Sequence, residues 1–180
     1  MSLRDVDPSV TVPWWNEATG ALPAAYTTTA GANPLHHAAI PPSARVPGGP
    51  SQTLRTGPAP GSLPTQAQID GVMGRGDFLD FSAGLRQLHN QVHGEIGGSM
   101  GLVANAAFDP IFWAHHSFVD RAWRLWQLEH SSTGLPPSVL ATALAPFPMT
   151  VQQTLSVTAL GYDYAQSTLS LPFAPAGGPS

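Results

Sequence analysis

The sequence lacks cysteine and lysine and is poor in charge. Its 180 residues contain no cysteine, so disulfides and thiolate metal ligands are excluded. All seven basic residues are arginines scattered along the chain, and eleven acidic residues give a net charge of -4. This balance gives no reason to expect nucleic acid or an anionic membrane surface as a partner.

Long apolar runs and targeting signals are also missing. No run approaches the ~20 apolar residues of a membrane-spanning helix. The opening segment MSLRDVDPSV has no basic region followed by an apolar stretch, so we expect no secretory signal and a cytoplasmic protein. With 42% apolar residues, the chain has enough material for a core, and its length suits a single domain over residues 1–180.

Histidine is concentrated in residues 88–127, which hold four of the seven histidines of the chain. His89 and His93 are four residues apart, so on a helix both rings leave the same face, one turn apart. We predict this helix over residues 82–94 from an apolar stripe formed by Phe81, Leu85, Leu88 and Val92. Taken alone, the pair is more typical of two core or boundary histidines with backbone partners.

A second helix is predicted over residues 110–129, with Asp109 as N-cap and Pro110 in its first turn. It carries His115 and His116, which lie about 100° apart around a helix axis and so cannot easily meet one metal together. Two imidazoles from one helix and a third from its neighbour suit a transition metal with an open coordination position.

The motifs in this region form one string. In chain order they read His89-Asn90-x-x-His93, Ile96-Gly97-Gly98-x-Met100, Asp109-Pro110-Ile111-Phe112-Trp113-x-His115-His116 and Asp120-Arg121-x-Trp123. The string resembles the second copper-binding half of the tyrosinase, catechol oxidase and haemocyanin family, the type 3 copper proteins. Two flanking segments extend the resemblance over residues 13–164, namely Pro13-Trp14-Trp15 and Tyr162-Asp163-Tyr164.

The resemblance implies a copper site with His89, His93 and His116 as ligands, because the family uses the second histidine of the adjacent pair. His115 is then a neighbour of the copper site that hydrogen-bonds nearby. Phe112 lies one turn before His116 and is expected to pack against the copper-bound rings.

Two further residues take catalytic roles from the resemblance. Asn90 occupies the place of an asparagine that orients a water able to accept the phenol proton. The other partner of that water is an acidic residue upstream, for which Asp80, nine residues before His89, is the nearest candidate. The plain alternative is that Asp80 is a helix-start charge.

The fold implied is mainly α, half of the tyrosinase-type four-helix bundle with long irregular loops. Residues 31–66 form a Pro/Gly-rich loop, and residues 165–180 are expected to be a loose tail. The loop contains His36 and His37, which could bind metal but are more typical of solvated or backbone-bonded side chains. Residues 151–164 are expected to be extended.

The function implied is copper-dependent oxidation of phenols or catechols to o-quinones with O2, as monooxygenase or catechol oxidase. The first copper half of the family is not recognisable in the sequence, so we expect a partner chain or a homodimer to supply the second copper site. The alternatives are a copper- or oxygen-binding protein without turnover, as the haemocyanins are, or a truncated assembly subunit.

Overall fold

The computed structural model describes residues 7, 9, 11, 13–130 and 135–164, and it is mainly helical, as predicted. The α-helices are α2 (Ala24–Thr27), α3 (Gln66–Met73), α4 (Phe78–Ile96), α5 (Val103–Ala106), α6 (Pro110–His130) and α7 (Pro137–Leu140). Three short 3-10 helices are η1 (Glu17–Thr19), η2 (Pro42–Ala44) and η3 (Val151–Thr154). Within the described residues, no helix has the length and apolarity to cross a membrane.

The described residues fall into two compact units, and both α4 and α6 contribute to each. The first unit comprises Met1–Thr65 and Gln87–Asp120, and the second comprises Gln66–Arg86 and Arg121–Ser180. All candidate site residues except Asp80 belong to the first unit.

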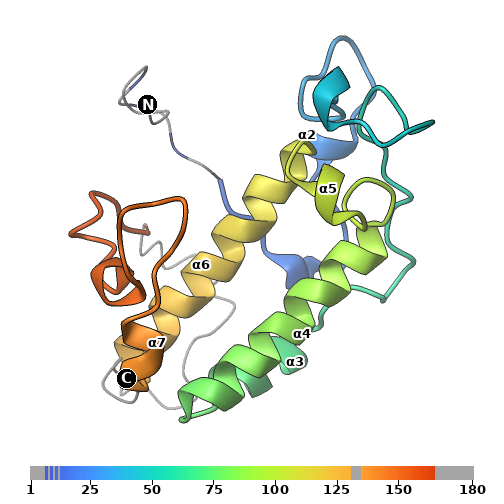
Figure 1. Ribbon diagram of the computed structural model, residues 1–180. Helices are drawn as coiled ribbons and strands as arrows, with labels where there is room; N and C mark the ends of the chain where they lie inside the picture. Colours follow the sequence, from blue (N-terminus) through green and yellow to red (C-terminus); the bar gives the residue numbers. More distant parts are fainter. Residues whose placement is uncertain (1–6, 8, 10, 12, 131–134, 165–180) are drawn as a thin grey trace. The chain divides into compact units, whose positions relative to one another are not determined.

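The core of the first unit lies where the later turns of α4 meet the first turns of α6. Val92 and Ile96 of α4 and Ile111 of α6 are fully buried, and Trp15 from the N-terminal segment packs with them. Figure 1 shows α5 in the connection between the end of α4 and the start of α6. This short connection keeps the two histidine-bearing stretches in one unit.

Both long helices begin at an aspartate cap. The Asp77 carboxylate accepts hydrogen bonds from the backbone N–H groups of Leu79 and Asp80, which starts α4 at Phe78, one turn before the predicted start. The Asp109 carboxylate accepts from the Ile111 N–H at 3.1 Å, which confirms the predicted start of α6. Sequence periodicity missed the first turn of α4 because its stripe begins only at Phe81.

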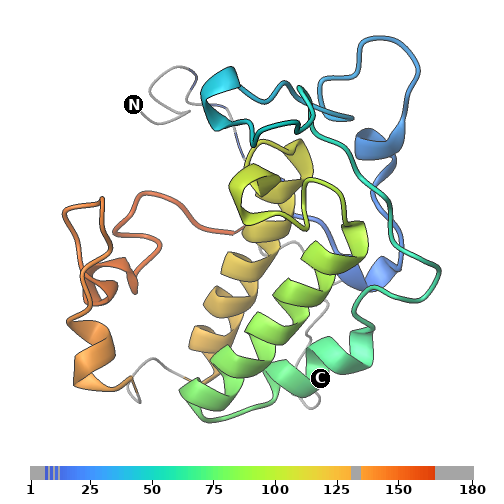
Figure 2. The same cartoon turned by 45° about the vertical axis from the view of Figure 1, so that its right-hand side comes forward.

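The glycine pair Gly97-Gly98 follows the last residue of α4, Ile96, two residues beyond the predicted end of this helix. Both residues have positive φ angles, of 62° and 55°, a conformation that favours glycine. A Cβ on Gly98 would lie 2.2 Å from the Leu54 carbonyl oxygen. The backbone of the Pro/Gly-rich loop, residues 31–66, therefore approaches Gly98 as closely as a glycine allows. Figure 2 shows this mostly irregular loop running beside the connection between α4 and α6.

The second unit is organised by stacked aromatic rings. Phe81 stacks on Trp126 with centroids 4.6 Å apart, and Trp123 and His130 also stack on Trp126, with centroids 5.5 and 5.0 Å away. The Trp126 Nε1–H donates to the Arg75 carbonyl at 2.6 Å. The expectation of an extended 151–164 segment is wrong at its start, because Val151–Thr154 form η3 with a capping box on Thr150. The expected tail at 165–180 lies outside the described residues.

Candidate metal centre

Three imidazoles from α4 and α6 converge on one point. His89 and His93 lie one turn apart on α4, and His116 reaches them from α6. The His116 Nε2 atom lies 3.4 Å from the His89 Nε2 and 3.3 Å from the His93 Nε2. The structure therefore brings together the three residues predicted as metal ligands.

Hydrogen bonds at the opposite ring nitrogens set the direction of the lone pairs. The His93 Nδ1–H donates to the Met100 carbonyl oxygen at 2.7 Å, and a carbonyl can only accept. The His89 Nδ1 lies 2.9 Å from the Asn90 side-chain oxygen, to which it donates. Both rings therefore present unprotonated Nε2 atoms to the point of convergence, which is how outer partners commonly orient metal-binding histidines.

The spacing of these nitrogens fits a metal ion. Nitrogen ligands about 2.0 Å from one ion in a tetrahedral or trigonal arrangement lie about 3.3–3.5 Å from each other. The two observed separations, 3.3 and 3.4 Å, fall in this range. With the Nδ1 protons of His89 and His93 donated to their acceptors, both Nε2 lone pairs lie close to the His116 Nε2, so the donor set suits an ion.

Burial favours the neutral imidazole of His93 and of His116. Burial lowers the pKa of His116 to about 3, with further lowering from the neighbouring His115, His89 and His93. Burial also lowers the pKa of His93. Metal ligation requires the neutral imidazole, so protons do not compete for His116 at neutral pH.

Phe112 packs on the cluster, as predicted. Its ring stacks on His116 with centroids 3.9 Å apart and planes at 25°, and it meets the edge of His93 at 5.9 Å. The rings of His89, His93 and His116 are half-buried, so one side of the cluster is accessible in this unit. The Phe112 ring thus borders the histidine cluster.

His115 lies behind the three other rings and is fully buried. It stacks on His89 with centroids 5.0 Å apart, and its ligand atom lies within 4.8 Å of those of the other three histidines. Its Nδ1 bonds to the carboxyl of Glu17 at 2.5 Å, whereas its Nε2 is buried without a hydrogen-bond partner. Burial lowers the pKa of His115 to about 3.

Glu17 is the site residue that the sequence interpretation missed. Its side chain is 1% exposed, and burial raises the pKa of its carboxyl well above the usual value, although His89 acts in the opposite direction. Glu17 lies 98 residues from His115. The one signal was a lone acid directly after the Trp14-Trp15-Asn16 segment, and spacing rules give no reason to pair it with a distant histidine.

The two residues predicted to be catalytic lie in different places. Asn90 is at the cluster, bonded to His89, and its role toward substrate stays a prediction. Asp80 is exposed in the first turn of α4 and belongs to the second unit. The group of histidines that could hold a metal within the described residues does not include it.

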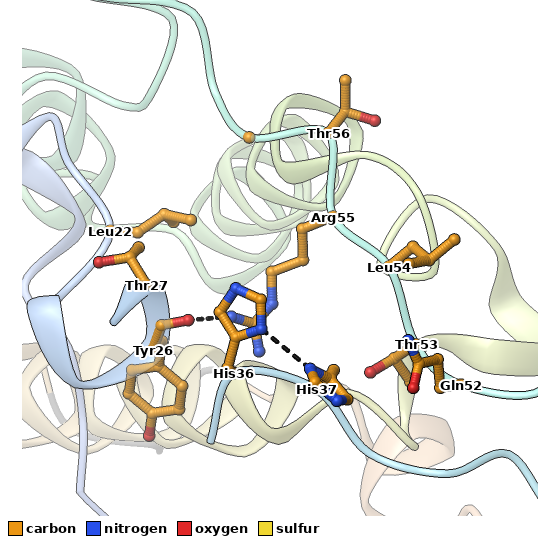
Figure 3. A pocket seen from close by; sticks show the side chains of 11 residues that line it. Leu22, Tyr26, Thr27, His36, His37, Gln52, Thr53, Leu54, Arg55 and Thr56 are labelled. Carbon is orange, nitrogen blue, oxygen red and sulfur yellow. Dashed lines mark hydrogen bonds between the residues drawn. The ribbon is translucent and has the colours of Figure 1, made fainter. Parts of the chain in front are cut away.

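The other adjacent pair, His36 and His37, lines a pocket of about 350 Å³ in the first unit. Their Nδ1 atoms lie 2.9 Å apart, so one ring donates to the other (Figure 3). Within the described part of the chain, neither belongs to a group of three or more potential metal ligands. A hydrogen bond between two partly solvated rings accounts for this pair.

A helical unit that presents converging neutral imidazoles from two helices has the architecture of a transition-metal protein. Comparison with known proteins names the family. Residues 60–129 match the family model of the common central domain of tyrosinase. The chain is a member of the tyrosinase and haemocyanin family of type 3 copper proteins, whose members bind copper.

Individual relatives come from both branches of this family. The tyrosinase of Streptomyces glaucescens is 28% identical over 176 residues, covering 76% of this chain and 61% of that protein. Hemocyanin 1 of Megathura crenulata is 41% identical over 64 residues, or 33% of this chain and 2% of that protein. A functional unit of octopus haemocyanin superposes with a TM-score of 0.70 at 29% identity, covering 87% of this chain and 46% of that one. The chain thus spans part of each relative.

Proposed function

We propose that His89, His93 and His116 bind one copper ion, and that this site forms half of a centre that oxidises phenols or catechols to o-quinones with O2. The observation that carries the proposal is the convergence of three Nε2 atoms at 3.3 and 3.4 Å. Copper follows from the neutral imidazole donors, for which it has the highest affinity among common divalent metals, and from the family.

The copper ions supply the binding of O2 and the transfer of electrons. The residues of this chain hold and shape the site. Asn90 and the Met100 carbonyl keep the Nδ1 protons of His89 and His93, so that Nε2 stays available to the metal. The half-buried Phe112 ring offers an apolar, aromatic face beside the nitrogens, against which a phenolic ring packs. In this proposal Asn90 also helps to orient the water that receives the phenol proton.

The second copper ion needs a second set of ligands. We propose that a partner chain supplies it, with a second copy of this chain as the other option. Support comes from the donor set, since the described residues contain one group of histidines that could hold a metal ion. A two-fold dimer would place two identical histidine sets face to face. Copper-loaded protein that sediments as a monomer and oxidises no catechol would exclude the dimer and favour the partner chain.

A binding function without turnover is the second candidate, and the match to the octopus haemocyanin functional unit over 87% of this chain favours it. Catechol separates the two candidates. An oxidase loaded with copper, together with its second half, produces quinone absorbance under O2. A carrier changes its spectrum reversibly with O2 and leaves catechol unchanged.

The metal assignment is tested by elemental analysis after dialysis. We expect one copper per chain in the wild type and none in the His93→Ala variant, because two nitrogens do not replace the three-nitrogen set. The matched control is His37→Ala, which removes an exposed histidine outside the cluster. We expect this variant to bind one copper per chain, as the wild type does. Stoichiometric copper in His93→Ala would show that the converging nitrogens are not the site.

A further inference from the structure

Glu17 and His115 form a buried pair that the proposed copper ligation does not use. The carboxyl of Glu17 is 1% exposed and the imidazole of His115 is fully buried, and their contact joins the N-terminal segment to α6. The short helix η1 holds Glu17 in place, because the Asn16 side chain accepts from the Ala18 N–H at its start and Gly20, at φ 72°, closes it.

The ring of His115 lies against all three imidazoles of the proposed copper site. It stacks on the face of His89 at 22°, with centroids 5.0 Å apart. It lies edge-on to His93 and to His116, with centroids 4.9 and 5.2 Å away and interplanar angles of 78° and 79°. Of the three rings, His89 is therefore the one whose plane follows the plane of His115.

The proposed ligands also differ in what holds the plane of each ring. The torsion that turns an imidazole about its Cβ–Cγ bond has broad minima, so neighbouring groups must fix the plane. The His93 ring donates to the backbone carbonyl of Met100, a fixed acceptor. The His116 ring stacks on Phe112 with centroids 3.9 Å apart. Each of these two rings has a direct restraint that does not involve His115.

His89 depends more strongly on its stacking partner. Its Nδ1–H donates to the side chain of Asn90, which is exposed and has rotational freedom of its own. This bond sets the proton on Nδ1 but leaves the plane of the ring less restricted. The face of His89 lies on His115, whose own ring is buried and is held at Nδ1 by the Glu17 carboxyl at 2.5 Å.

We propose that Glu17 is a positioning residue of the copper site, which holds the plane of the His115 ring and, through the stack, the plane of the ligand His89. This inference rests on the proposed copper site of His89, His93 and His116. A metal ion accepts the lone pair that lies in the plane of the imidazole, so a ring that turns moves its Nε2 lone pair away from the ion. Outer partners that orient ligands in this way commonly change metal affinity by about 10–100-fold.

The test is long-range 1H–15N NMR of the histidine rings in the full chain with one equivalent of Cu(I), which is diamagnetic, under anaerobic conditions. The 15N shift of a ring nitrogen changes when it binds the ion. We expect three bound rings in the wild type and in Glu17→Gln, whose amide still hydrogen-bonds to the His115 Nδ1. In Glu17→Leu, which removes that bond but keeps the volume, we expect the His89 signal to broaden toward the free position. His93 and His116 should stay bound, and the Cu(I) affinity should fall by about 10-fold.

The outcomes separate this inference from the proposed function. A His89 signal that stays bound in Glu17→Leu would overturn the role of Glu17 and leave the three-histidine site intact. Equal losses at all three rings would also overturn it, because they would show a general structural effect. A wild-type chain that binds no Cu(I) would overturn the copper site itself.

A second variant keeps the test decisive if Glu17→Leu does not fold. Glu17→Asp keeps a buried acid, but its shorter side chain withdraws the carboxyl from the His115 Nδ1, so we expect the same selective loss at His89. A bound His89 in this variant would overturn the inference. The matched control is Glu129→Leu, which alters an exposed acid on α6 and should give the wild-type spectrum and affinity.

Discussion

The ion pair between Arg55 and Asp109 provides the sharpest test of how the fold supports the site. The guanidinium of Arg55 donates through Nε and Nη2 to the carboxylate of Asp109, which is fully buried. It also donates to the carbonyl oxygens of Tyr26 and Leu35, at 2.6 and 2.9 Å. One side chain thus joins the irregular loop and α2 to the first turn of α6.

Replacing Arg55 with Met keeps much of the side-chain volume and removes every one of these donors. The carboxylate of Asp109 then stays buried, and within the described residues the Ile111 N–H is its remaining hydrogen-bond donor. Removal of one partner from a buried ion pair costs about 3–5 kcal/mol. Small domains have free energies of unfolding of about 5–15 kcal/mol. We therefore expect Arg55→Met to lose a large share of this stability.

A double-mutant cycle isolates the charge interaction. Asparagine is as good an N-cap as aspartate, so Asp109→Asn keeps the cap of α6 while it removes the buried charge. The combination of Arg55→Met with Asp109→Asn should therefore be less destabilised than the sum of the two single variants, by about 2–3 kcal/mol.

Urea unfolding followed by far-ultraviolet circular dichroism measures these free energies. The matched control is Arg86→Met, an exposed arginine on α4, which should change the free energy of unfolding by no more than about 0.5 kcal/mol. If the free energy of unfolding of Arg55→Met lies within about 1 kcal/mol of the wild-type value, the loss is smaller than expected for a broken buried ion pair, and the reasoning is wrong.

Three further predictions concern the site itself. His116→Ala should lose copper in elemental analysis while His115→Ala keeps most of it, and the reverse result would mean that the orientation of α6 is assigned incorrectly. Asn90→Leu should weaken copper binding by about 10–100-fold in a competition titration, because His89 loses the acceptor that fixes its Nδ1 proton, and an unchanged affinity would refute that role. Gly98→Ala should lower the unfolding midpoint, since its Cβ would lie 2.2 Å from the Leu54 oxygen, whereas Gly94→Ala, with open space around it, should not.

The parts of the fold and site that could be predicted are those encoded within a few residues. The four-residue spacing of His89 and His93 and the Asp109-Pro110 start of α6 are local signals, and both appear in the structure as expected. The family string added the choice of His116, which the residues alone leave open. Local patterns therefore located α4, α6 and the converging nitrogens.

The remaining features depend on pairs of residues far apart in the sequence. Arg55 and Asp109 are 54 residues apart, and nothing in the Pro/Gly-rich loop marks this arginine as the one that is buried. Glu17 stands next to three polar or aromatic residues and reads as a surface acid until its partner is known. Periodicity carries no information on such pairs, because they are determined by tertiary packing and not by the helix or strand repeat.

The contact between Glu17 and His115 also has a consequence for the order of events during synthesis. Its two residues are 98 positions apart, which corresponds to roughly 5–20 s of elongation at 5–20 residues per second. During this interval the N-terminal segment emerges from the ribosome without the α6 residues that bury Glu17 and Trp15. A metal ion can meet all three histidines only after His116 has emerged, so loading of the proposed copper site follows the synthesis of α6.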